Sequence, residues 1–302
     1  MNRENLFKNC TLCPRNCGVD RTKQTGYCGA GDKLKVARAA LHLWEEPCIS
    51  GENGSGTVFF SHCNLKCVYC QNHQISQGEF GVEITPERLS EIFFELKEKG
   101  AHNINLVTPT HFIPPILDAL DLSKGLDIPI VYNTSGYETP DTIEMLRGYV
   151  DIFLTDLKYY DERFSEKYSF CPNYFEKAKE ALEKMVEMVG KPKFDKTGML
   201  LSGVIVRHMA LPNLTDDTKR ILKYLNRTYG NDVLISIMSQ YTPFFKADEF
   251  SEIANPISKD DYDDILDYAQ MLGIENGYIQ EGESAKESFI PNFDGEGVVQ
   301  GG

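Results

Sequence analysis

From about residue 55 onward, short apolar runs alternate with longer stretches in which apolar residues recur every three or four positions. Short, nearly continuous apolar runs are typical of buried parallel strands, and the longer periodic stretches are typical of amphipathic helices. A seventh, short strand is expected near residues 278–280. The six longer strands are predicted at 57–61, 103–107, 128–132, 151–157, 200–206 and 233–238.

The predicted helices have recognisable first and last turns. Two of them begin with a Thr-Pro pair followed by an acidic residue, at Thr85 and at Thr139. Threonine caps the first amide groups of a helix, and proline suits the first helical position. Gly100 ends the first of these helices. The other helices are predicted at 113–122, 174–189, 216–229 and around 262–272.

Strands that alternate with helices predict βαβ units and a parallel sheet, because a parallel connection needs a crossover segment. The fold class is therefore α/β. The pattern by itself fits an open doubly wound sheet and a partial barrel equally well.

Length and charge narrow the class of protein. A chain of 302 residues suffices for one large α/β barrel or two small domains. It has no apolar run near the roughly 20 residues of a membrane span and no N-terminal signal segment, so we expect a cytoplasmic protein without a membrane partner. Its net charge of −14 disfavours binding to nucleic acid or anionic membranes.

Nine cysteines are many for such a protein, and in a reducing compartment they indicate metal ligands more than disulfides. Cys48 and Cys171 stand alone and are interpreted as small buried residues. The other cysteines form two groups, Cys10, Cys13, Cys17 and Cys28 near the N-terminus and Cys63, Cys67 and Cys70 directly after the first predicted strand.

The second group has three thiols at spacings of four and three residues, with Tyr69 before the last one. A purely electron-carrying [4Fe–4S] cluster usually takes four Cys ligands, so three leave one iron open for chemistry. A structural zinc site would need four protein ligands, and no fourth Cys or second pair follows Cys70.

The N-terminal group lies in a short, turn-rich segment that cannot form a core of its own, and small modules of this kind often rely on a metal. Its four thiols suit a tetrahedral zinc ion or a second iron–sulfur cluster. Their spacing fits neither site closely, and a segment without metal stays an alternative.

The Cys-x3-Cys-x2-Cys pattern with its aromatic residue resembles the signature of the radical S-adenosylmethionine (SAM) enzymes. The resemblance implies that Cys63, Cys67 and Cys70 hold a [4Fe–4S] cluster and that Tyr69 packs near the adenine of SAM. In that superfamily the open iron holds the amino and carboxylate groups of SAM. It also implies a partial (β/α)6 barrel of the TIM type, with the cluster after the first strand.

A narrower resemblance extends over roughly residues 10–293. The N-terminal Cys-x-x-Cys-Pro-Arg, Glu46-Pro47, and the segment from Gly54 through Cys70-Gln71-Asn72 are similar to a pyruvate formate-lyase activating enzyme-like branch of the superfamily. We predict a Cys-rich metal-binding segment at 1–50, the partial barrel at 51–293 and a flexible tail at 294–302.

Further site residues are expected where the strands end, because parallel α/β folds bind ligands at the carboxyl ends of their strands. Asp156, Lys158 and Arg207 offer charges to SAM, and the resemblance places Asn133 near its ribose. The competing interpretations are turns, helix caps and a surface ion pair. The predicted SAM-binding residues are Tyr69, Thr108, Thr110, Asn133, Ser135, Asp156, Lys158, Arg207 and Met238.

The resemblance implies an oxidoreductase that reductively cleaves SAM to methionine and a 5′-deoxyadenosyl radical, with an electron from a donor such as flavodoxin or ferredoxin. In activating enzymes the radical takes hydrogen from a glycine of a partner glycyl-radical enzyme, and this is the leading expectation. The alternatives are hydrogen abstraction from a small molecule or another protein side chain, and a non-catalytic iron–sulfur or zinc protein.

Overall fold

The computed structural model describes residues 3, 5–279 and 290–299. Within them, seven parallel strands lie side by side in chain order. These strands are β2 (Ser55–Phe60), β4 (Ile104–Val107), β5 (Ile130–Thr134), β6 (Ile152–Asp156), β8 (Leu200–Met209), β9 (Leu234–Met238) and β10 (Gly277–Ile279).

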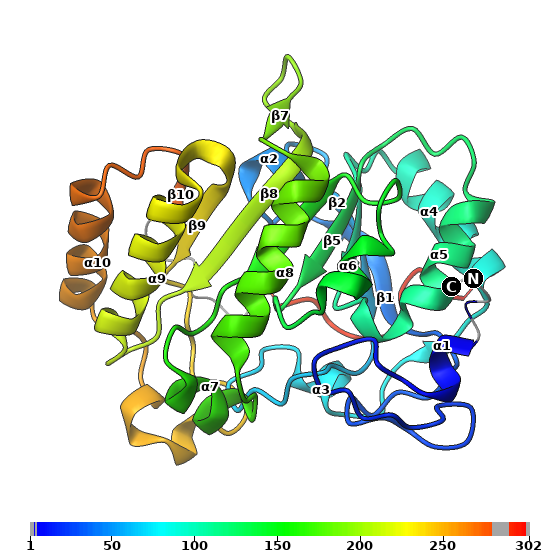
Figure 1. Cartoon of the computed structure of the whole chain (residues 1–302). Coiled ribbons are helices and arrows are strands. Elements are labelled where there is room, and N and C mark those ends of the chain that lie inside the picture. Colours follow the sequence, from blue (N-terminus) through cyan, green and yellow to red (C-terminus); the bar gives the residue numbers. More distant parts are fainter. Residues whose placement is uncertain (1–2, 4, 280–289, 300–302) are drawn as a thin grey trace.

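Two antiparallel strands extend this sheet beyond β2. β1 (Lys35–His42) pairs with β2, and β3 (Val82–Glu83) pairs with β1. The sheet therefore runs from β10 at one end to β3 at the other without closing, which confirms the partial barrel. A hairpin formed by β7 (Lys193–Phe194) with the start of β8 projects from the top of the molecule (Figure 1).

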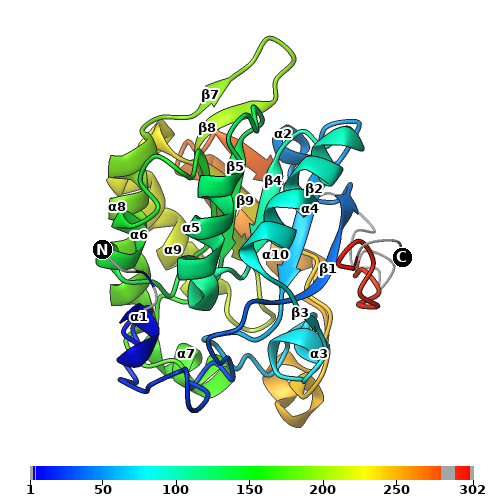
Figure 2. The ribbon, with the colours of Figure 1, turned by 90° about the vertical axis from the view of Figure 1, so that its right-hand side faces the viewer.

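The longer helices lie on the outside of the curved sheet (Figures 1 and 2). Thr85 and Thr139 cap their helices as predicted, each accepting a bond of 3.3 Å from an amide three residues on. The longer helices are α4 (Pro86–Glu98), α5 (Ile113–Leu122), α8 (Tyr174–Val189), α9 (Thr215–Thr228) and α10 (Lys259–Met271). Shorter ones are α1 (Asn5–Lys8), α2 (Pro47–Ser50), α3 (His73–Ser76), α6 (Pro140–Glu144) and α7 (Glu162–Ser169).

The strand β1 and the helix α2 were not predicted. β1 is rich in alanine, which is depleted in strands, and its burial does not alternate along the chain. Because β1 is antiparallel to β2, His42 lies beside Ser55, at the amino ends of the parallel strands. The chain then enters the barrel from that end, where Cys48 and Ile49 pack against residues of β5, β6, β8 and β9.

The described part of the predicted flexible tail is packed against β1. The amide of Ala39 donates to Glu296 O at 2.8 Å, the amide of Gly295 donates to Ala37 O at 3.1 Å, and Val298 is fully buried. Residues 300–302 lie outside the described residues. Cys48 and Cys171 are both buried, as expected for isolated cysteines.

Candidate active site

A cavity of about 420 Å³ lies inside the open barrel. Its lining comes from the carboxyl-terminal halves of the parallel strands, from residues 42 and 44–47 at and after the end of β1, and from the Cys loop, residues 61–72, that follows β2. Of the predicted site residues, the cavity is lined by Cys63, Cys67, Tyr69, Cys70, Thr108, Asn133, Ser135, Asp156, Lys158, Arg207 and Met238.

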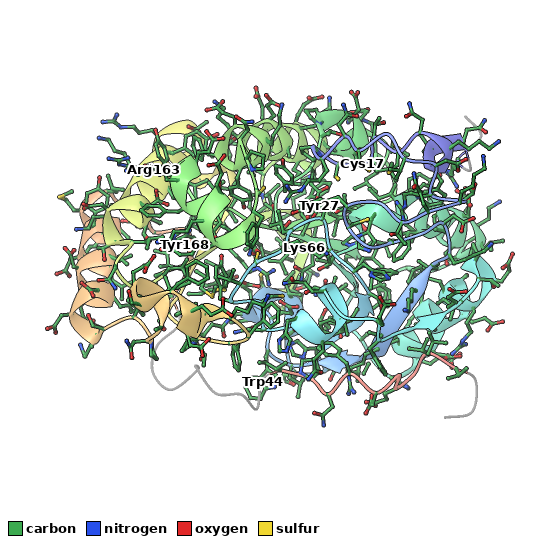
Figure 3. The ribbon with its side chains drawn as sticks, turned by 90° about the horizontal axis from the view of Figure 1, so that it is seen from below. Cys17, Tyr27, Trp44, Lys66, Arg163 and Tyr168 are labelled. Carbon is green, nitrogen blue, oxygen red and sulfur yellow. The ribbon has the colours of Figure 1, made fainter. Side chains whose placement is uncertain are left out.

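Backbone hydrogen bonds hold the Cys loop in place. The amide of Val68 donates to Tyr168 O at 2.8 Å, and Val68 O accepts from the amide of Lys246 at 2.9 Å. The side chain of Asn64 donates to Tyr137 O at 2.8 Å. Figure 3 shows Lys66 of this loop between Tyr27 and Tyr168 in the view from below. The loop is therefore anchored on both sides without using its thiols.

Each of the three loop thiols has a polar neighbour. The Leu65 amide donates to Cys63 Sγ at 3.4 Å, the Ser169 hydroxyl donates to Cys67 Sγ at 3.0 Å, and Cys70 Sγ lies 3.2 Å from Ser76 Oγ. Burial raises the pKa of all three thiols, that of Cys70 to about 11. Without a metal they stay protonated at neutral pH, and the polar neighbours favour the thiolate form that a metal binds.

No group of three or more His, Cys, Asp or Glu side chains within 3, 5–279 and 290–299 is arranged to hold a metal ion. A [4Fe–4S] cluster makes a different demand, because its thiolates bind separate irons. Three buried thiols around one cavity, each with a polar neighbour, fit that donor set.

Tyr69 connects the loop to α7 through its hydroxyl. It shares a hydrogen bond with the Tyr159 hydroxyl, which in turn lies 2.8 Å from Ser169 Oγ. Its ring packs edge-on against Tyr241, with centroids 5.8 Å apart. Tyr69 is thus a buried aromatic residue of the cavity wall, fixed by its hydroxyl and its ring contact.

The charged residues at the strand ends form one chain of ion pairs. Lys158 Nζ lies 2.6 Å from Asp156 Oδ2, and Asp156 Oδ1 lies 3.1 Å from Arg207 Nε. Arg207 also donates to Asn133 Oδ1 at 2.6 Å. Burial alone would raise the pKa of Asp156, but the two cations hold it below its usual value. The cavity therefore contains a charged carboxylate between two cations.

Sequence reasoning missed Glu45, which completes this chain. Its Oε2 lies 3.1 Å from Arg207 Nη1, and its Oε1 accepts from Asn105 at 3.1 Å and from Asn133 at 3.3 Å. Glu46 follows it and also lines the cavity. Glu46-Pro47 was noted only as part of a resemblance, because nothing in the local sequence predicts that β1 delivers these residues into the barrel.

Thr108 and Thr110, predicted together, lie in different surroundings. Thr108 lines the cavity in a left-handed backbone conformation, with φ of 58°. Thr110 does not line it, because its hydroxyl donates to Glu138 Oε1 at 2.7 Å. Burial raises the pKa of Glu138 to about 8, and its Oε2 has no hydrogen-bond partner.

The four N-terminal cysteines lie outside this cavity. A Cβ placed on Gly26 would be 3.3 Å from Cys28 Sγ and 3.6 Å from Cys17 Sγ, so these two thiols flank one backbone position. Cys10 Sγ accepts from Arg21 at 3.8 Å. Burial, with a smaller contribution from the nearby thiols of Cys28 and Cys10, raises the pKa of Cys13 to about 12. The thiols converge, yet no arrangement that would support zinc occurs among the described side chains.

The model of the radical SAM superfamily matches residues 57–225, which include the Cys loop and the strands up to α9. The chain belongs to the radical SAM superfamily. This membership implies a [4Fe–4S] cluster and SAM as cofactors, and the three cavity thiols fit the cluster.

Two curated relatives are similar to this radical SAM protein. An uncharacterized protein of Methanocaldococcus jannaschii is 32% identical over 285 residues, covering 90% of this chain and 77% of its own length. The pyruvate formate-lyase-activating enzyme of Clostridium pasteurianum is 26% identical over 183 residues, covering 59% of this chain and 71% of its own length.

Solved structures agree on the fold. Methylornithine synthase (PylB) matches with a TM-score of 0.52 and 15% identity, covering 97% of this chain and 84% of the other. Several larger matched structures are only about half covered, at 46–54% of their length. In the part of the chain that the structure describes, no helix combines the length and apolar character needed to span a membrane.

Proposed function

We propose that this protein reductively cleaves SAM and uses the resulting radical to abstract hydrogen from a substrate. One observation carries the proposal: three buried thiols and a chain of paired charges line the same cavity. When bound, the cluster supplies the electron that breaks the sulfonium–carbon bond of SAM. The cavity residues bind and orient SAM and keep water away from the reaction.

Specific roles follow from where each residue lies. Arg207 is held by carboxylates and presents a fixed guanidinium, which suits the carboxylate or a ribose hydroxyl of SAM. Asn133 and Ser135 at the end of β5 suit the ribose, and Tyr69 suits the adenine. Thr108, Asp156, Lys158 and Met238 complete the proposed SAM site.

Anaerobic reconstitution followed by reduction with dithionite in the presence of SAM tests this proposal. We expect methionine and 5′-deoxyadenosine as products, measured by chromatography with mass detection. An intact, reducible cluster that leaves SAM uncleaved would instead favour the non-catalytic alternative.

For the substrate, we propose the backbone glycine of a partner glycyl-radical enzyme as the leading candidate. The support is the similarity to a protein named pyruvate formate-lyase-activating enzyme, at 26% identity. Mixing the reduced protein and SAM with glycyl-radical enzymes of the same genome should give a persistent carbon-centred radical on the partner, detected by electron paramagnetic resonance.

The second candidate is a small molecule or a protein side chain. Glu46 favours it, because a glycine backbone offers no charge to a carboxylate in the cavity wall that forms no ion pair among the described residues. SAM cleavage without any partner radical would support this candidate.

The remaining partners and sites are also proposals. A flavodoxin or ferredoxin would supply the electron in a cytoplasmic setting. The N-terminal thiols would hold zinc or a second cluster, and metal analysis that finds only the iron of one cluster would refute this.

A further inference from the structure

Among the described residues, and apart from His, Cys and Tyr, five ionisable side chains line the cavity: the carboxylates of Glu45, Glu46 and Asp156 and the cations Lys158 and Arg207. Four of them form the chain of ion pairs from Lys158 through Asp156 and Arg207 to Glu45. Among the described residues Glu46 belongs to no ion pair. The lining thus has one carboxylate more than it has cations.

Glu46 is buried. It is 8% exposed to solvent, and its Oε2 has no hydrogen-bond partner among the described residues. Arg207 acts on it electrostatically, but the two form no ion pair. The Ser236 side chain also forms a hydrogen bond with Glu46. A buried carboxylate with one oxygen unsatisfied and no ion pair lowers stability, so its presence in a cavity wall calls for a functional explanation.

Glu46 reaches the cavity from the amino ends of the parallel strands. It follows β1, whose last residue, His42, lies beside Ser55 at the amino end of β2. Cys63 comes after the opposite end of β2. Glu45, beside Glu46, reaches Arg207 at 3.1 Å, and Arg207 lies beside Asp156, the last residue of β6, so these carboxylates extend from the amino-end entrance to the middle of the cavity. Superfamily members hold SAM by its amino and carboxylate groups at the open iron, so the sulfonium belongs to the Cys side of the cavity.

We infer that Glu46, with Glu45 beside it, forms a subsite that binds a cationic group of the substrate, an alkylammonium or a guanidinium. Charge-assisted hydrogen bonds from such a group would satisfy the free oxygen of Glu46 and balance the surplus carboxylate. The inference rests on the proposed function in one respect: the substrate shares the cavity with SAM. It adds the chemical class of the substrate group that this part of the cavity wall recognises.

The test uses the reconstituted protein with SAM bound and three probes: n-butylguanidinium, n-butylammonium and n-butanol. Ligand-observed saturation-transfer NMR and calorimetry measure their binding. We expect the two cations to bind and the alcohol not to bind. Glu46→Gln keeps the shape and removes the charge, and should weaken cation binding at least tenfold. Glu98→Gln, on the exposed end of α4, should leave binding unchanged.

A second arm distinguishes the source of the cation. If acetyl-Gly-Arg-Gly-amide binds more tightly than n-butylguanidinium, the cationic group belongs to a protein side chain. If the peptide binds more weakly, the cationic group belongs to a small molecule. Equal cation binding by wild type and Glu46→Gln, or no binding by wild type, would overturn the inference. So would a tenfold loss of SAM affinity with unchanged cation binding, because Glu46 would then contact SAM.

Dithionite-driven formation of 5′-deoxyadenosine is measured in parallel on both proteins. Its absence from wild type refutes the proposed function, while the binding data still decide the subsite. Its presence together with absent cation binding refutes the subsite alone.

Discussion

The contacts of Arg207 show how single residues fix the orientation of a charged group in this cavity. Glu45, Asp156 and Asn133 contact three of its nitrogens, so its guanidinium is fixed before any ligand arrives. The sequence predicted that Arg207, Asp156 and Asn133 all lie at strand ends, without predicting that they contact one another. It did not suggest Glu45, whose place depends on the direction of β1.

Glu45→Gln should weaken SAM binding through Arg207. The substitution keeps the side-chain shape but replaces one acceptor oxygen by a donor and removes one of two carboxylates that pair with a buried cation. We expect the KM for SAM to rise several-fold, and a stability loss of ~1–3 kcal/mol, below that of a fully unpaired buried charge because Asp156 remains. Kinetics of SAM cleavage and thermal melting measure the two effects. An unchanged KM beside a lower melting temperature would show that Glu45 is structural only.

Glu138 should make the protein less stable as pH rises. Its folded pKa of about 8 lies above its ordinary value, so the folded state holds the proton more tightly than the unfolded state. Stability is therefore highest below the ordinary pKa and falls as pH rises toward 8, by up to about 1.4 kcal/mol per unit. Glu138→Gln should flatten this slope in melting curves taken at pH 5, 6.5 and 8. A slope equal to that of wild type would contradict the prediction.

At the scale of elements, the Cys loop depends on α7, a helix that was not predicted. The end of this helix places the Ser169 hydroxyl 3.0 Å from Cys67 Sγ and next to the Tyr159 hydroxyl. The Cys spacing alone could predict the thiols, because their number and order are local properties. It could not predict the donors that face them, because those come from a contact across about 100 residues of chain.

Ser169→Ala should lower the reduction potential of the cluster. Hydrogen bonds to thiolate sulfur stabilise the reduced, more negative state, and losing one worth ~1 kcal/mol corresponds to about 40 mV for one electron. A redox titration followed by electron paramagnetic resonance measures the shift. Ser258→Ala removes the N-cap of α10 and is a matched control that should cost stability without moving the potential. A potential unchanged by Ser169→Ala would show that this hydroxyl does not act on the cluster.

For the whole molecule, the sequence predicted the alternation of strands and helices, and the Cys motif selected the open barrel. A mostly apolar run such as Ile152–Asp156 can be recognised as a strand from the local sequence, without knowledge of its tertiary contacts. The antiparallel extension by β1 and the packing of residues 294–299 depend on pairing between distant segments. Both features lie beyond β2 at one end of the open sheet, and the chain that follows β1 carries Glu45 and Glu46 into the cavity.

The last prediction concerns the fold and the chemistry together. Replacing Cys63, Cys67 and Cys70 by Ala should abolish SAM cleavage and the electron paramagnetic resonance signal of this cluster, yet leave the fold intact. The loop is held by backbone bonds to residues 168, 169 and 246, and none of them uses a thiol. Circular dichroism should therefore match wild type while 5′-deoxyadenosine falls below detection. Residual SAM cleavage in a well-folded triple variant would exclude these cysteines as the cluster ligands, and global unfolding would show that the cluster itself holds the barrel mouth together.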